Sequence, residues 1–196
     1  MPSTWERPRD IFRWDWSAER VEWSPTPTPV PGGDARGVAV TPEAIYAAIP
    51  GGAYVLKRDG RVWERIEFDV RVDAAMASYA GRLYVAGYGG ELFSKDDGAD
   101  VWDYIHPEFN YESVRAIAVE GGSLYVATYY GLFGRPVPDG SWVRLSPSGK
   151  TNDGIVGSGG GSRDVGFTGW PISSIAVADG AIYLATERHF VRARLP

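Results

Sequence analysis

The side chains most often used in catalysis are scarce in this 196-residue sequence. Histidine occurs only at His106 and His189, and cysteine does not occur. The two histidines fall in different repeats of the pattern described below, so we expect neither a general base nor a metal site from them. A group of aspartates could hold a calcium ion weakly, but its spacing is not that of an EF-hand loop. These are Asp96, Asp97, Asp100 and Asp103. We therefore expect no catalytic residues, no bound metal and no cofactor.

Aromatic residues offer a second chemistry, because they form the anchors of protein interfaces and can stack on sugars. The sequence contains eight tryptophans, and four of them stand outside the repeat pattern. With tyrosines from short turns they form our candidate partner-binding set: Trp14, Trp16, Trp23, Tyr88, Tyr129, Tyr130 and Trp170. A structural alternative stays open. In it, Phe12, Trp14 and Trp16 line one face of an extra strand packed on the last repeat.

Two arginines complete the candidate partner-binding set. Arg36 and Arg115 each stand one residue before the first strand of a repeat, in the first and third repeats. A guanidinium at this position could donate to an anion or a carbonyl group at the mouth of a central channel. Alternatively, both arginines form surface ion pairs, which contribute little to stability. The nearby acids are Asp34, Asp73 and Glu112.

Length and composition exclude several classes of protein. A chain of this length forms one domain with a buried core. The formal net charge of −5 argues against a nucleic-acid partner and against an anionic membrane surface. The N-terminal residues are polar, so we expect no signal peptide, and the longest apolar stretch, residues 44–56, is shorter than a membrane span. We expect a soluble protein that is cytoplasmic or part of an assembled particle.

An internal repeat supplies the elements that would position these residues. Four pairs of short apolar segments share one pattern, in which a tyrosine follows the end of the first segment by 6 residues. The tyrosines are Tyr46, Tyr84, Tyr125 and Tyr183. A third apolar segment follows each tyrosine, and a tryptophan follows the first three by 17 or 18 residues: Trp63, Trp102 and Trp142. Such runs, separated by glycine-containing turns, predict β-strands.

The last repeat lacks its tryptophan, and the N-terminus can supply it. Counting 18 residues past Tyr183 leads beyond the end of the chain and, continued from residue 1, reaches Trp5. The segment Trp5-Glu-Arg7 also repeats Trp63-Glu-Arg65. We therefore predict an all-β fold, a four-bladed β-propeller closed by an N-terminal strand that pairs with the last blade and covers its edge.

One turn of the second repeat resembles a known motif. Residues Leu92-Phe-Ser-Lys-Asp-Asp-Gly-Ala-Asp-Val-Trp102 are similar to the Asp-box of sialidase-type (BNR) propeller repeats, Ser-x-Asp-x-Gly-x-Thr-Trp. Asp100 stands at the threonine position, and the tryptophan comes one residue late. The resemblance implies a structural turn between the third and fourth strands of a blade, and therefore a fold rather than an activity. The arginine-rich site of sialidases has no counterpart that we assign.

The repeat intervals predict a single domain over residues 1–196. Its blades span about 36–70, 73–110, 113–145 and 172–196, the last completed by 3–8, with insertions at about 9–35 and 146–171. Each insertion joins an outermost strand to the innermost strand of the next blade. In antiparallel blades such a connection emerges at the same end as the turn between the second and third strands. That end collects the extra aromatic residues, and loops on a rigid scaffold commonly carry binding.

These observations favour a binding module over an enzyme. We expect a protein partner within a larger assembly, with a virion part as one setting, contacted by the loop-rich aromatic face. The alternative is a lectin-like propeller that binds glycans through the same aromatic residues, and an enzyme acting on saccharides is a third reading. We expect no nucleic-acid partner and no membrane partner.

Overall fold

The computed structural model describes residues 12–14, 23–25, 30–31, 35–67, 72–87, 89–107, 113–128, 131–145, 172–186 and 190–195. Residues 12–14, 23–25 and 72–74 are described by their backbone alone. Every regular element in these ranges is a β-strand. Accordingly, no helix of the described residues is long and apolar enough to span a bilayer.

Most of these strands form four antiparallel sheets, each built from consecutive strands. The first sheet contains β3 (Gly37–Val40), β4 (Ala44–Ile49), β5 (Gly52–Lys57) and β6 (Glu64–Ile66). The second contains β7 (Val72–Tyr79), β8 (Arg82–Gly87), β9 (Leu92–Asp96) and β10 (Asp103–Ile105). The third contains β11 (Val114–Glu120), β12 (Ser123–Thr128), β13 (Leu132–Pro136) and β14 (Val143–Arg144). The fourth contains β15 (Ile172–Ala178), β16 (Ala181–Thr186) and β17 (Phe190–Arg194).

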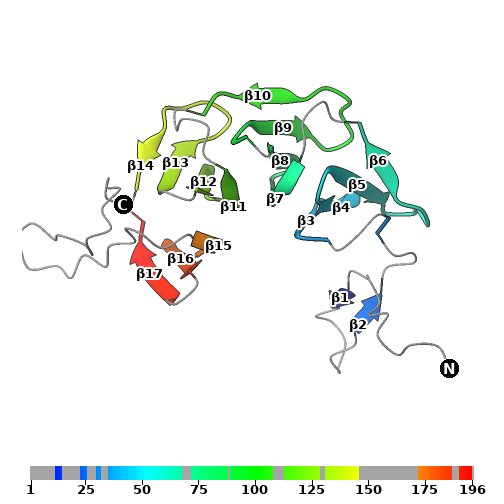
Figure 1. Ribbon diagram of the computed structural model, residues 1–196, viewed down its shortest axis with the longest axis horizontal. Helices are drawn as coiled ribbons and strands as arrows, with labels where there is room; N and C mark the ends of the chain where they lie inside the picture. The colour runs from blue at the N-terminus through cyan, green and yellow to red at the C-terminus, as the bar shows by residue number, and fades with distance from the viewer. Residues whose placement is uncertain are drawn as a thin grey trace, which may run out of the picture.

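The four sheets lie along an arc, with their first strands toward its inside (Figure 1). Successive first strands are neighbours: β3 contacts β7, β7 contacts β11, and β11 contacts β15. A separate antiparallel pair, β1 (Phe12–Trp14) and β2 (Trp23–Pro25), lies near the end of the arc that the first sheet forms. The all-β class and the succession of antiparallel sheets predicted from the repeat are thus confirmed.

Tight turns explain the constant spacing of the repeat tyrosines. The hairpins of the second, third and fourth sheets each turn through two residues with positive φ: Ala80-Gly81, Gly121-Gly122 and Asp179-Gly180. Two consecutive positive φ values are those of a type I′ turn, whose twist matches the strands that it joins. The first hairpin turns through Pro42-Glu43 instead, and there the Thr41 hydroxyl accepts the backbone N–H of Ala44 at 3.1 Å. Both kinds of turn give the hairpin the same strand register: Val40 pairs with Ile45 as Ser78 pairs with Leu83.

Each repeat tryptophan stands immediately before the outermost strand of its sheet. Trp63 precedes β6, Trp102 precedes β10 and Trp142 precedes β14. The indole N–H of Trp142 donates to the backbone carbonyl of His106 at 2.9 Å, which links the third sheet to the end of the second. The fourth sheet has three strands among the described residues. Trp5, the residue predicted for its fourth strand, lies outside them.

One interface recurs between successive sheets. At each junction a tyrosine of one sheet packs against two aliphatic residues of the next. The sets are Tyr46 with Leu83 and Val85, Tyr84 with Leu124 and Val126, and Tyr125 with Ile182 and Leu184. All six aliphatic side chains are at most 2% exposed. Because apolar burial is the main favourable term in folding, this repeated contact is what joins the sheets into one body.

The residues that form this interface at the inner junctions have counterparts at the two ends of the arc. Among the described residues, no neighbouring sheet packs on these counterparts. Tyr183 of the fourth sheet is half-buried, and Phe190 beside it is 73% exposed. On the first sheet, the receiving positions around Ala47 and Trp63 are buried together with Val30. The described residues therefore form an open arc, and they do not show the predicted closure of the ring.

The repeated interface yields a first prediction. Leu124→Ala removes a fully buried side chain between the second and third sheets. We expect it to lower the free energy of unfolding by about 2–5 kcal/mol in urea denaturation, since it leaves a cavity that the neighbouring sheets fill only in part. The control is Val40→Ala, where the side chain is 60% exposed. Equal and small losses in both variants would contradict the assigned interface.

Candidate functional site

The two predicted arginines lie at the N-terminal ends of inner strands and are exposed. Arg36 directly precedes β3, and its backbone N–H donates to the carbonyl of Ala48 at 2.8 Å. Arg115 lies inside β11, at the register shift between Val114 and Ala116, and not before the strand as we predicted. Strand β7 of the second sheet lies between β3, which Arg36 precedes, and β11, which contains Arg115 (Figure 1). Neither forms an ion pair with another described side chain.

The aromatic set falls almost entirely outside the described residues. Trp16, Tyr88, Tyr129, Tyr130 and Trp170 are not described. The backbones of Trp14 and Trp23 pair directly across β1 and β2. The same holds for the acids proposed as arginine partners: Asp34 and Glu112 are not described, and Asp73 is described by its backbone alone. The aromatic binding surface therefore stays a prediction.

The alternative reading of these aromatic residues is met in part. Phe12 and Trp14 do belong to an extra strand, β1. That strand pairs with β2 and lies near the first-sheet end of the arc, whereas we placed it on the last repeat (Figure 1). The sequence could not show this pairing, because the partner strand Trp23–Pro25 contains a proline and is only 3 residues long.

Asp97, in the turn after β9, ties the second sheet to the first. Its carboxylate accepts the Tyr46 hydroxyl at 2.7 Å and the backbone N–H of Glu43 at 3.3 Å. Burial alone would raise the pKa of this carboxyl, but hydrogen bonds from Thr41, Tyr46 and two backbone N–H groups outweigh burial and hold the pKa below its usual value. Burial and the bond to Asp97 raise the pKa of Tyr46. The pair is therefore a carboxylate and a neutral phenol at physiological pH.

Arg82, at the start of β8, binds two polar residues of the Asp-box-like motif and an aspartate of the strand that follows it. Its Nε and Nη2 atoms donate to the Ser94 hydroxyl at 3.2 and 3.1 Å. Its Nη1 pairs with Asp96 at 2.8 Å, and Nη2 pairs with Asp103. Burial alone would lower the pKa of Arg82, and its bonds to the two aspartates raise it above the usual value. Because these contacts join β8, β9 and β10, they act in this geometry as structural links.

These contacts matter for the possibility that the aspartates hold a calcium ion. Asp96 and Asp103 share Arg82, and Asp97 accepts hydrogen bonds from the first sheet. In the described part of the chain, no group of three or more histidine, cysteine, aspartate or glutamate side chains could hold a metal ion. His106 has its Nδ1 2.9 Å from the carbonyl oxygen of Pro107, and His189 is not described.

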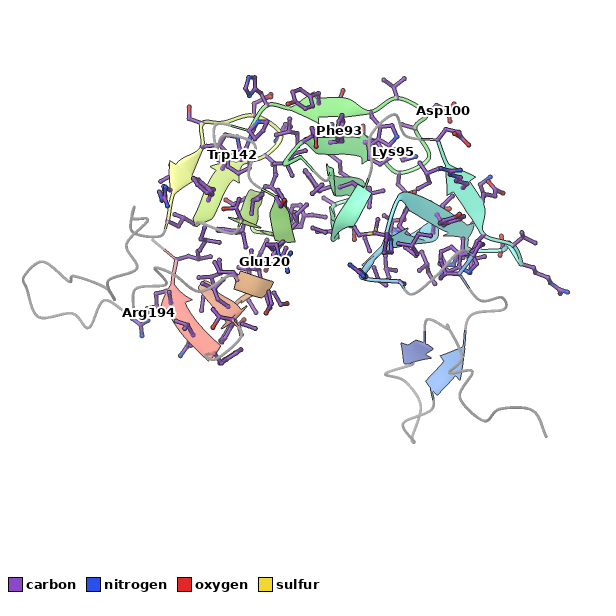
Figure 2. The ribbon with its side chains drawn as sticks, in the orientation of Figure 1. Phe93, Lys95, Asp100, Glu120, Trp142 and Arg194 are labelled. Carbon is purple, nitrogen blue, oxygen red and sulfur yellow. The ribbon has the colours of Figure 1, made fainter. Side chains whose placement is uncertain are left out.

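A groove lies between the first and second sheets, at the end that carries the turns β3–β4, β5–β6 and β9–β10. Its volume is about 860 Å³, and we call it the turn groove. Apolar atoms of Ala44, Val55, Ile66 and Trp102 contribute to its lining. Its charged lining consists of Glu43, Lys57, Arg58, Asp59, Glu64, Arg65, Glu67, Lys95, Asp97 and Asp100. Lys95 and Asp100 lie on the side of the second sheet that is next to the first (Figure 2).

The ammonium group of Lys95 is held over the aromatic lining of the turn groove. Its Nζ lies 5.2 Å from the ring centroid of Trp102 and 6.0 Å from that of Tyr46. It also donates to the carbonyl of Ala99 at 2.9 Å. Attraction between a cation and an aromatic face operates at these distances. Lys95 therefore fastens the wall of the groove and is not a free surface cation.

Sequence reasoning missed the turn groove. The groove is lined by the turns at Asp59-Gly60 and Asp97-Gly98, which belong to different repeats. Only the packing of one sheet on the next brings them to one cavity. A usable signal is the excess of charged residues in these turns over the equivalent turn of the third repeat, around Asp139-Gly140.

Comparison with known proteins identifies the fold. The chain matches no protein-family model and no curated protein sequence. It does match solved structures. The nidogen/laminin complex has a TM-score of 0.70 at 10% identity, covering 95% of this chain and 68% of that chain. YCF48 bound to D1 peptide has a TM-score of 0.66 at 12% identity, covering 89% of this chain and 55% of that chain. The extracellular domain of BT4673, a one-component system of B. thetaiotaomicron, has a TM-score of 0.64 at 12% identity, covering 93% and 26%.

This chain has a β-propeller-type fold. It spans about a quarter of the BT4673 chain and just over half of the YCF48 chain. Identities of 10–12% establish the arrangement of the sheets and say nothing of activity.

The Asp97 network yields a second prediction. A carboxylate whose folded-state pKa is depressed stabilises the fold above its unfolded pKa of about 3.9, and this stabilisation disappears as the pH falls through the folded-state pKa. Asp97→Asn should therefore lower the free energy of unfolding by about 1–2 kcal/mol at pH 7, and the deficit should shrink below about pH 4. Urea denaturation as a function of pH measures both.

Asp139→Asn is the matched control, because Asp139 is the exposed aspartate of the equivalent turn in the third sheet. It should leave the unfolding free energy unchanged at every pH. A deficit in Asp97→Asn that stays constant from pH 7 to about pH 3 would argue that the amide disturbs packing and that the charge of Asp97 contributes nothing.

Proposed function

We propose that this chain is a non-enzymatic binding module that holds a protein partner within a larger assembly, of which a virion is one setting. One observation carries the proposal. The sheets form a rigid scaffold, and its longest connections all emerge at one end. The segment between β14 and β15 covers residues 145–171, whereas the turns at the opposite end are as short as two residues. Long loops on a rigid scaffold are the usual carriers of binding.

The nature of the proposed partner rests on two of the similar structures. One contains nidogen with laminin, and another contains YCF48 with a D1 peptide. Both are propeller-type scaffolds that hold a protein or a peptide. By analogy we propose a protein partner for this chain, and we keep glycan binding as an outcome of the test.

The proposed contact surface is the insertion end of the module. It would combine the aromatic residues of the insertions and short turns with the exposed guanidinium groups of Arg36 and Arg115. Aromatic and arginine side chains dominate the energy of protein interfaces because they bury large, weakly hydrated areas. Tyr129 and Tyr130 are the best test positions, because they stand together in the short connection between β12 and β13.

We further propose that the arc closes into a four-bladed ring. Support comes from the end of the arc that the fourth sheet forms, where a packing position and a strand edge have no partner among the described residues. Tyr183 occupies the position that packs against the next sheet at the other three junctions, and Phe190 stacks beside it at a centroid distance of 6.0 Å. Strand β17 has no partner on its outer side among the described residues, and an unpaired edge strand is a liability. A strand around Trp5 would cover that edge.

Closure yields the third prediction. Deleting residues 1–8 should lower the melting temperature severely, because it removes the proposed fourth strand of the last sheet. Trp5→Ala should cost on the order of 3–5 kcal/mol, the range for a buried aromatic residue, and should match Trp63→Ala. Differential scanning calorimetry measures both. A truncated chain that melts like the full chain would reject this mode of closure.

Partner binding yields the fourth prediction. Tyr129→Ala, Tyr130→Ala and a shortened 154–162 segment should each weaken incorporation into the native complex without lowering the melting temperature. Loss of one interface hot spot corresponds to about 2 kcal/mol, or roughly thirtyfold in affinity. Co-purification with the partner complex, followed by titration of the purified components, provides the measurement.

Asp139→Asn at the opposite end serves as the control and should retain full binding. A glycan-binding module would instead show sugar affinity in the isolated protein, and the same tyrosine variants would abolish it. If the control variant lost the partner while both tyrosine variants kept it, the assignment of function to the insertion end would be wrong.

A further inference from the structure

We propose that the turn groove between the first and second sheets binds a basic peptide segment, one in which arginine or lysine alternates with apolar residues. The site lies at the end of the module opposite to the insertions. It is therefore independent of the partner surface proposed above, and either proposal can fail without the other. The volume of the groove, its charges and the hydrogen bonds that hold its walls all favour such a ligand.

The turn groove has the size and lining of a recognition site. Its volume of about 860 Å³ falls within the range of pockets that hold ligands. Val55, Ile66 and Trp102 give it apolar surface, and Ile66 and Trp102 are only half-buried. Val62 and Val101, on the two turns beside the groove, are 69% and 74% exposed. Apolar side chains of a peptide would find contacts at both the lining and the rim.

Most basic groups of the groove are already engaged. Lys57 pairs with Glu64 at 3.0 Å, and Lys95 lies over Trp102. Arg58 donates to the carbonyl of Pro42 at 3.4 Å. Arg65 is the remaining cation of the lining, and no contact with a described residue engages it.

Most acidic groups of the groove are not engaged. Glu64 is paired, and Asp97 accepts hydrogen bonds from the first sheet. The other four carboxylates are exposed and form no ion pair with a described residue: Glu43, Asp59, Glu67 and Asp100. The contacts of Arg58 and Lys95 are with neutral groups and leave their charges in place, so the lining carries six carboxylates against four basic groups, a net charge of −2 that attracts cations. A guanidinium ligand suits such a rim best, since it can bridge a carboxylate with two parallel hydrogen bonds.

The walls of the groove are held in place before any ligand arrives. The Tyr46–Asp97 hydrogen bond of 2.7 Å joins the first sheet to the second across the groove. Lys95, bonded to the Ala99 carbonyl, fixes the turn that carries Asp97 and Asp100. A site that needs little ordering on binding keeps more of its interaction energy as affinity. Because the walls are rigid, we infer a bound peptide as the occupant and not a diffuse layer of counterions.

The test measures binding of a fluorescein-labelled synthetic peptide in which arginine and leucine alternate, by fluorescence anisotropy with the full chain. We expect saturable binding that weakens when NaCl is raised from about 50 to about 500 mM, because salt screens exposed charges. A peptide with glutamate in place of arginine should not bind. A peptide with serine in place of leucine should bind at least about fivefold more weakly, since it lacks the apolar contacts.

The decisive variant is Glu43→Gln/Asp59→Asn, which neutralises two carboxylates of the rim. Its matched control is Glu120→Gln/Asp139→Asn, which makes the same charge change at the corresponding end of the third sheet, at the last residue of β11 and in the β13–β14 turn. Glu120 lies on β11, away from Lys95 and Asp100 (Figure 2). We expect about a fivefold loss of affinity or more in the groove variant and no loss in the control, with unchanged melting temperatures in both. Tyr129→Ala/Tyr130→Ala should bind the peptide like the wild type.

Three results would overturn the proposal. Equal losses in the groove variant and its control would mean that the peptide senses only the net charge of the chain. Wild-type affinity in the groove variant would mean that the peptide binds elsewhere. A concentration-dependent dimer of the wild type that Glu43→Gln/Asp59→Asn dissociates, measured by analytical ultracentrifugation, would assign the groove to a second copy of this chain instead.

Discussion

The packing of a tyrosine from one sheet against two aliphatic residues of the next is the interaction on which this fold depends. A single four-stranded sheet buries one face at most, and a short sheet on its own is marginal in water. Stacking successive sheets buries both faces of the inner ones, as the full burial of Leu83 and Leu124 illustrates. Each sheet packs only against the sheets next to it, so the stabilisation from these interfaces adds up along the chain, as in other repeat proteins.

The same constraint determines where function can lie. Both faces of the second and third sheets are occupied by neighbouring sheets, so surface for recognition is left at the two ends of the strands. One end carries the insertions, which we propose to hold a protein partner. The other end carries short turns, and packing of the first sheet on the second brings three of these turns together around the turn groove. A propeller-type scaffold can in this way offer two separate surfaces.

The sequence predicts the strands well because strand spacing is a local property. A two-residue turn such as Gly121-Gly122 sets the register of its hairpin without help from the rest of the chain. The position of Arg115 was predicted less well, since it lies at a register shift that moves the strand start to Val114. The turn groove escaped prediction altogether. Glu43 and Asp97 are distant in the chain, and only the tertiary contact of two sheets brings them together.

A distance between the first and fourth sheets shows whether the ring is closed. The chain has no cysteine, so spin labels attach only at introduced positions. Val40→Cys and Ala178→Cys place labels at exposed sites on β3 and β15, and Glu120→Cys with Ala178→Cys gives a reference pair on two adjacent sheets. Double electron–electron resonance should give a narrow distribution for the first pair, centred near the distance of the reference pair. A broad distribution centred at a clearly longer distance would show that the arc stays open and that the proposed four-bladed ring is wrong.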